Sequence, residues 1–164
     1  MFRCDRPTGN SGGGVLLYVR SSLKPVEFVP LAQYPEHAWC KTRGSNNNEL
    51  LIGACYRSSN TKIYADGSHK LLRDLVAEVG NQHTLMIGDF NYGGIDWNSN
   101  TVSATAGKEC QQFLNNLEDN FFTQHVTAPT RGKSILDLIL SNEPDLVIVM
   151  LNVSNTLGLV TTMC

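Results

Sequence analysis

A short apolar segment, residues 84–88 (TLMIG), lies between two stretches whose apolar residues recur at helical spacing. The first stretch, 68–79, is rich in leucine and valine and is followed by Gly80, which supplies a stop. In the second, 108–119, the apolar residues fall at i, i+3, i+4 and i+7: Cys110, Phe113, Leu114 and Leu117. The intervening segment is too short for a helix and predicts a buried strand. A strand between two amphipathic helices indicates a layered α/β fold.

Further strand-like segments fill the rest of the chain and are separated by turn residues. In the first half they form an expected antiparallel meander: 14–20, 26–29, 38–42 and 49–56. After the second helix they are 121–126, 135–140 and 146–153. We therefore predict one α/β domain over residues 1–164. Its expected architecture is a four-layer α/β sandwich, incomplete here, in which two mainly antiparallel sheets are flanked by helices.

Composition excludes several classes of protein. The 164 residues contain no apolar run of the ~18 residues that a membrane helix needs and no charged-then-apolar leader. Their formal net charge is −2, so any contact with DNA must come from a local basic patch. The five cysteines are widely spaced and odd in number, which argues against zinc binding and disulfides. An intracellular, non-secreted protein is expected.

The strongest chemical signal is Asp89 followed by Asn91 at the exit of the predicted strand 84–88. Side chains two residues apart on an extended chain point the same way. Cleavage of a phosphodiester needs a group that orients or deprotonates water and a donor for the phosphate oxygens, and this pair could supply both. The alternative is an ordinary turn rich in Asp and Asn.

Two other strand ends carry polar residues that could join such a site. Tyr56 could donate its hydroxyl to a phosphate and Arg57 could clamp one, although surface packing is the commoner reason for such a pair. Asp137 lies in the apolar segment 135–140, where an unpaired carboxylate would be costly. We therefore expect Asp137 to have a partner, either a backbone donor or a catalytic histidine.

Six blocks in this order resemble the endonuclease/exonuclease/phosphatase superfamily, and in particular the apurinic-type endonuclease domain of non-LTR, jockey-like retrotransposons. They are GGGVLLYVR, EHAWCK, LLIGACYRSSN, LMIGDFNYGGIDW, FFTQHVTAPTRGKSILDLILSN and LNVSNTLG. The resemblance implies a four-layer sandwich that nicks double-stranded DNA with Mg²⁺. It also implies a reverse transcriptase domain in the same polyprotein, which extends the nick, and therefore a nuclear location for a functional copy.

The resemblance also implies roles for individual residues. Asp89 would orient or deprotonate the attacking water, and Asn91 and Tyr56 would hold the scissile phosphate. Asp137 would fix the orientation of a histidine. The turn that contains Arg131 and Lys133 matches a hairpin near the DNA groove and, with Arg57, would contact DNA, although by charge alone this turn could simply be solvated.

Three elements that the resemblance implies are missing from the sequence. The chain starts after the strand that carries an Asn and after the strand that ends in the metal-binding Glu, and neither Glu36 nor Glu49 stands in that Glu's place. Where a Ser-Asp-His segment should follow Gly158, residues 159–164 read LVTTMC. A one-frame slip in a possible set of codons for these residues would spell Ser-Asp-His, which the nucleotide sequence can test.

We therefore expect this copy to be inactive as a nuclease. Two alternatives stay open at the level of sequence. The chain could be a non-catalytic remnant that binds DNA, or it could belong to a phosphatase branch that acts on small phosphoesters.

Overall fold

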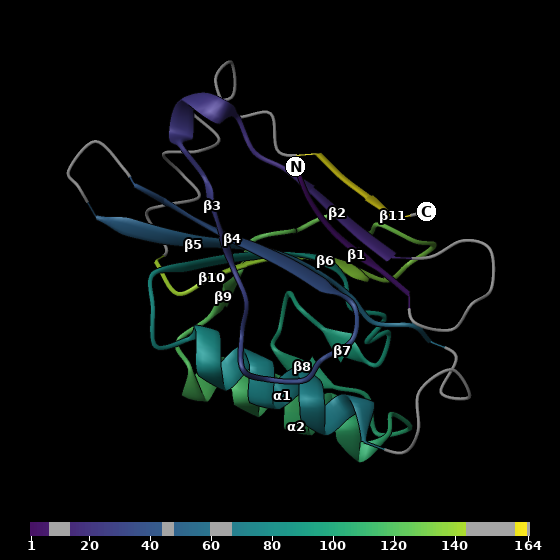
Figure 1. Ribbon diagram of the computed structural model, residues 1–164. Coiled ribbons are helices and arrows are strands. Elements are labelled where there is room, and N and C mark those ends of the chain that lie inside the picture. Colours follow the sequence, from purple (N-terminus) through teal and green to yellow (C-terminus); the bar gives the residue numbers. More distant parts are fainter. Residues whose placement is uncertain (7–13, 44–47, 60–66, 144–159, 164) are drawn as a thin grey trace.

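The computed structural model describes residues 1–6, 14–43, 48–59, 67–143 and 160–163 (Figure 1). A six-stranded sheet forms its centre. Its strands, in spatial order, are β3 (Val26–Phe28), β4 (His37–Arg43), β5 (Glu49–Tyr56), β6 (Thr84–Asp89), β10 (Asp137–Ser141) and β9 (Thr123–Gln124). Only the β5–β6 pair is parallel, and every other neighbouring pair in this sheet is antiparallel.

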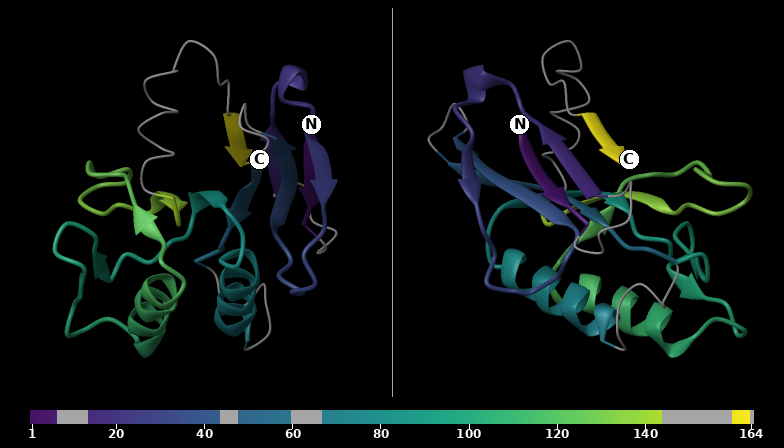
Figure 2. Two further views of the ribbon diagram at one scale, coloured as in Figure 1. Left: turned by 90° about the vertical axis from the view of Figure 1, so that its left-hand side faces the viewer. Right: turned by 45° about the vertical axis from the view of Figure 1, so that its right-hand side comes forward.

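A smaller antiparallel sheet packs on one face of the central sheet and two helices cover the other face (Figures 1 and 2). The smaller sheet contains β1 (Phe2–Asp5), β2 (Gly14–Tyr18) and β11 (Val160–Met163). The helices are α1 (Ser68–Val79) and α2 (Lys108–Asp119). A short helix, η1 (Ser21–Leu23), and the hairpin of β7 (Ile95–Asp96) and β8 (Thr101–Val102) complete the described elements. Neither helix is long and apolar enough to cross a membrane.

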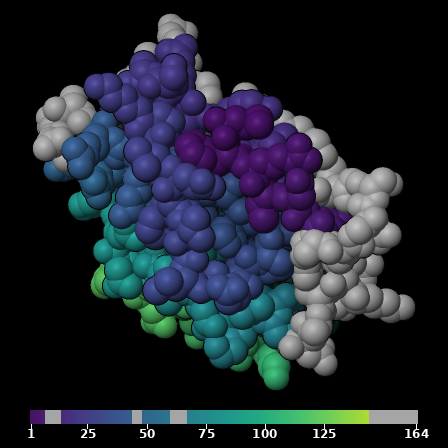
Figure 3. Space-filling view, viewed as in Figure 1, coloured from purple at the N-terminus to yellow at the C-terminus, as the bar shows by residue number. Residues whose placement is uncertain are grey.

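Alternation along the central strands explains this layering. On β5, Leu51 and Cys55 pack toward the helices, whereas Ile52 and Ala54 pack toward β2. Because side chains of a strand alternate between its two faces, an apolar run on both parities needs cover on both faces. In the space-filling view the N-terminal strands, in purple and blue, cover the face turned to the viewer, above the helical region in teal and green (Figure 3).

The α/β sandwich is thus confirmed, and the described residues supply two sheet layers and one helical layer besides the two-stranded sheet of β7 and β8. Both predicted helices have the expected bounds, 68–79 and 108–119. The meander is confirmed only for β3, β4 and β5, because β2 pairs instead with β1 and β11. The predicted strand 121–126 is reduced to two residues, since Phe121 has a left-handed φ of 60°. The predicted strand 146–153 lies outside the described residues.

Gly88 fixes how closely β5 and β6 approach next to their shared end. Its φ is +153°, and a Cβ built there would lie 1.7 Å from the carbonyl oxygen of Cys55. Such a contact is far inside van der Waals distance and involves backbone, so a larger residue would force the two strands apart. The closeness of β5 and β6 at this point therefore depends on glycine.

We predict that Gly88→Ala will destabilise the fold by about 3 kcal/mol or more, because it combines overlap with a strained backbone. Urea unfolding measures the difference. Gly132→Ala is the matched control, since Gly132 also has positive φ, 62°, but has open space around it. That control should cost only about 1–2 kcal/mol. Equal losses in the two variants would contradict this account of the β5–β6 contact.

Candidate active site

The register of the central sheet places Tyr56, Asp89 and Asp137 in one row across three strands. Tyr56 of β5 is the pairing partner of Asp89 of β6, and Asp89 is in turn the partner of Asp137 of β10. Residues that pair directly across neighbouring strands project from the same face of a sheet. The structure therefore brings together three of the residues predicted from sequence, on the face that also carries β2.

Asn91 reaches the same place by a different route from the one predicted. β6 ends at Asp89, and Asn91 lies beyond it with a left-handed φ of 53°. Alternation along an extended strand therefore does not orient this pair. Instead, the Asn91 backbone N–H donates to Oδ1 of Asp89 over 3.0 Å, which closes a tight turn around the carboxylate. The turn interpretation is therefore confirmed, and the site interpretation stays a prediction.

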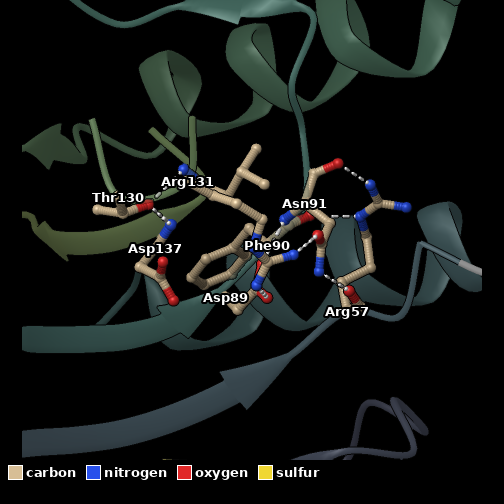
Figure 4. Close-up of polar contacts among 8 residues, drawn as sticks. Arg57, Asp89, Phe90, Asn91, Thr130, Arg131 and Asp137 are labelled. Atoms are coloured by element: carbon tan, nitrogen blue, oxygen red, sulfur yellow. Dashed lines mark hydrogen bonds and ion pairs between the residues drawn. The ribbon is translucent and has the colours of Figure 1, made fainter. Parts of the chain in front are cut away.

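Arg131 contacts both side chains of this turn (Figure 4). Its Nη2 donates to Oδ2 of Asp89 over 2.9 Å, and its Nη1 donates to Oδ1 of Asn91 over 3.3 Å. Asp89 is 2% exposed, whereas the Arg131 side chain is 61% exposed. The ion pair thus joins a buried carboxylate to a guanidinium that solvent and ligands can reach.

Thr130 links the hairpin of Arg131 to β10. Its Oγ1 accepts hydrogen bonds from the backbone N–H groups of Leu136 and Asp137, over 3.0 and 3.1 Å (Figure 4). Asp137 itself is half-buried and begins β10, so it does not lie inside the strand as its apolar neighbours suggested. The role of Thr130 was not predicted, because a threonine before a turn is common and carries no specific signal.

Burial raises the pKa of Asp89, and the negative charge of Asp137 acts in the same direction. The charge of Arg131 and the hydrogen bonds from Arg131 and Asn91 oppose this rise without cancelling it. A raised carboxyl pKa makes the carboxylate a stronger base. The site therefore contains a buried carboxylate, Asp89, whose proton affinity is limited by the exposed guanidinium of Arg131.

The other two predicted DNA contacts differ in their placement. Lys133 is exposed on the turn and lines a groove of about 540 Å³ between this hairpin and β7–β8. Arg57 is only 7% exposed, and its guanidinium donates to backbone carbonyl oxygens of Phe90 and Asn91 (Figure 4). A direct contact between Arg57 and DNA does not fit this placement, because the guanidinium is buried and bound to these carbonyl oxygens.

Glu36 is a buried neighbour of the row that sequence reasoning did not include in the site. It is fully buried, and its carbonyl oxygen accepts the N–H of Tyr56 over 3.0 Å. Arg6 pairs with its carboxylate over 2.8 Å and lies 5.5 Å from the centre of the Tyr56 ring. The available signal was a glutamate two residues before the predicted apolar strand 38–42.

Nowhere in the described ranges do three His, Cys, Asp or Glu side chains gather closely enough to hold a metal ion. The described hydrogen bonds of histidine side chains are made with residues other than Asp137. His69 contacts Tyr92, His83 contacts Glu143 and His125 contacts Ser141. Asp89 and Asp137 pair across adjacent strands, and Arg131 forms an ion pair with Asp89.

Residues 50–158, which contain the whole row and the Arg131 hairpin, match the profile of a family described as endonuclease-reverse transcriptase. The chain belongs to this family. A solved structure with a similar fold is the endonuclease domain of TRAS1, a telomere-specific non-LTR retrotransposon. The two share 14% sequence identity with a TM-score of 0.50, over 87% of this chain and 71% of the TRAS1 domain. No curated protein matches the chain.

Membership of the endonuclease-reverse transcriptase family agrees with the row described above. The matched segment covers β5, β6 and β10, whose ends carry Tyr56, Asp89 and Asp137. The sequence resemblance is therefore confirmed for the endonuclease-reverse transcriptase family, and the fold is similar to that of a non-LTR retrotransposon endonuclease. The roles of single residues stay predictions.

We predict that Arg131→Met will raise the pKa of Asp89 further, because a cation that stabilises the carboxylate is removed. NMR titration of the Asp89 carboxyl carbon measures this. A carboxyl whose pKa is higher in the folded state stabilises the fold when protonated and loses that stabilisation as pH rises through its folded pKa. The variant should therefore lose stability relative to the wild type as pH rises toward neutrality.

Lys133→Met is the matched control for this titration. It removes the same charge from the same exposed turn, but Arg131, and not Lys133, forms the described ion pair with Asp89. The control should shift the pKa of Asp89 much less. A pKa that does not respond to Arg131→Met, or responds equally to both variants, would show that the ion pair does not control this carboxylate.

Proposed function

We propose that this chain is the endonuclease domain of a non-LTR retrotransposon, a type of domain that binds DNA and nicks one strand. In this copy, the domain binds duplex DNA but does not cleave it. The observation that supports the proposal is the row of Tyr56, Asp89 and Asp137, with Asn91 and Arg131 in contact with Asp89. We expect these residues to place hydrogen-bond donors and a basic carboxylate oxygen around one phosphate group. Phosphodiester cleavage needs both.

Each residue has a role in this proposal. In an active copy, Asp89 would orient or deprotonate the attacking water, helped by the burial that raises its pKa. One hydrogen of the Asn91 amide is donated to the Arg57 carbonyl oxygen over 2.8 Å, and the second can be donated to a phosphate oxygen. Tyr56 donates its hydroxyl to the same phosphate. Asp137, next to Asp89, orients a histidine in a complete family site.

Arg131 has two uses in this proposal. Without DNA it neutralises Asp89; with DNA it turns to a phosphate oxygen, for which a guanidinium has suitable geometry. Its large exposure permits the exchange. Lys133, on the same turn, adds a second positive charge facing the duplex.

The proposed substrate is double-stranded DNA, and the proposed partner is a reverse transcriptase domain of the same polyprotein. A functional copy would act in the nucleus. The family reaction is expected to use Mg²⁺, but the described residues do not complete a site for it, so no step is assigned to the metal. A phosphatase acting on small phosphoesters is the second function to test, because the same row could hold a smaller phosphate.

We predict that supercoiled plasmid incubated with the purified chain and Mg²⁺ will stay intact to the same degree as with Asp89→Ala. The physical reason is that a site whose described residues gather no cluster of three metal-ligand side chains stabilises the transition state poorly. Nicking by the wild type above the level of the Asp89→Ala control would overturn the inactive assignment. Hydrolysis of a small phosphoester, absent in that control, would favour the phosphatase.

We also predict that the chain binds a short DNA duplex, with an affinity that falls as salt rises. Arg131→Met and Lys133→Met should each reduce the slope of log K against log salt by about 1, because each removes one phosphate contact. Fluorescence anisotropy at several salt concentrations measures the slope. Arg43→Met, an exposed arginine at the opposite end of β4, should leave the slope unchanged. Equal slopes in all four proteins would contradict this DNA-binding surface.

A further inference from the structure

Arg57 makes an unusual set of contacts for an arginine beside a proposed phosphate site. Its backbone N–H donates to the carbonyl oxygen of Asp89 over 2.9 Å. Its Nε donates to the carbonyl oxygen of Phe90, and its Nη2 to that of Asn91, each over 2.5 Å (Figure 4). One residue therefore bonds three successive carbonyl oxygens of the segment that carries Asp89 and Asn91.

The contact between Arg57 and Asn91 is reciprocal. The Asn91 side-chain amide donates back to the carbonyl oxygen of Arg57 over 2.8 Å. Asn91 has a left-handed φ of 53°, a conformation that costs about 1–2 kcal/mol for residues other than glycine, although asparagine tolerates it better than most. The bonds from Arg57 require the carbonyl groups of residues 89–91 to point inward together, which this left-handed turn achieves.

The guanidinium is itself held in place by the helical layer. It lies 4.1 Å from the centre of the Tyr92 ring, a stacked cation–π distance. Tyr92 stacks on Phe113 of α2, with 4.3 Å between ring centroids, and its hydroxyl contacts Nδ1 of His69 on α1 over 2.9 Å. Arg57 therefore connects both helices to the turn of the proposed site.

We propose that Arg57 is a positioning residue that holds Asn91 in its left-handed conformation and thereby aims the Asp89 and Asn91 side chains at the phosphate. Arg57 acts through the backbone of residues 89–91 and not through a contact with DNA. The proposal rests on the proposed DNA-binding function for its effect on affinity, but its structural part is independent of that function.

The test compares Arg57→Met, Arg57→Lys and the matched control Arg43→Met, each in the full chain. Asn91 Cα and Cβ chemical shifts, measured without DNA, should leave the left-handed range in Arg57→Met and return partly toward it in Arg57→Lys, which keeps a cation but not the planar fork. They should not change in Arg43→Met, whose side chain is exposed at the far end of the sheet.

Duplex affinity at several salt concentrations provides the second measurement. Arg57→Met should weaken binding about tenfold, the loss of roughly one charge-assisted hydrogen bond, while the salt slope stays that of the wild type. A direct phosphate contact would instead lower the slope by about 1. A lowered slope, or Asn91 shifts that stay left-handed in Arg57→Met, would overturn the proposal.

Two further results are also decisive. If the wild type does not bind duplex DNA, the proposed function fails, and the Asn91 shifts alone decide whether Arg57 positions the turn. If Arg57→Met does not fold, Arg57→Lys supports the proposal when it folds with altered Asn91 shifts and weaker binding at an unchanged slope. Unaltered shifts and affinity in Arg57→Lys would then overturn it.

Discussion

The pairing of β6 with β5 on one side and β10 on the other determines the position of the proposed site. This register places Tyr56, Asp89 and Asp137 side by side at the ends of three strands. A slip of one residue in either pair would send one side chain to the helical face, because strand side chains alternate. Gly88 allows the strands to approach closely at this point. The chemistry therefore depends on backbone pairing before it depends on any side-chain contact.

Charge is the second constraint on the site. Burial raises the pKa of Asp89, and the charge of Asp137, its partner across the adjacent strand, raises it further. Arg131, which is exposed, partly offsets both effects. Arg57, which is buried, holds the backbone of residues 89–91. The two arginines thus have separate tasks: one neutralises charge and can exchange partners, and the other orients carbonyl groups and cannot leave without exposing them.

Local patterns predicted much of this fold but only part of the site. Both helices were predicted with correct bounds because each carries a clear apolar stripe and packs it against the sheet. Asp89 and Asn91 were recognisable as polar residues after a strand, and Asp137 as a carboxylate within an apolar segment. The left-handed conformation of Asn91 was not, since it depends on hydrogen bonds from Arg57, 34 positions earlier in the chain. The placement of β2 in a second sheet likewise depends on pairing with β1 and β11, which no local pattern specifies.

We propose that one end of the central sheet forms a single phosphate-binding site. Backbone amide NMR of the chain during titration with a short DNA duplex tests it most directly. We predict that the largest chemical-shift changes cluster at residues 56, 89, 91, 131 and 137, which are distant in sequence and adjacent in the structure. Shifts confined to the outer surfaces of α1 and α2, or spread over the surface without a focus, would contradict it.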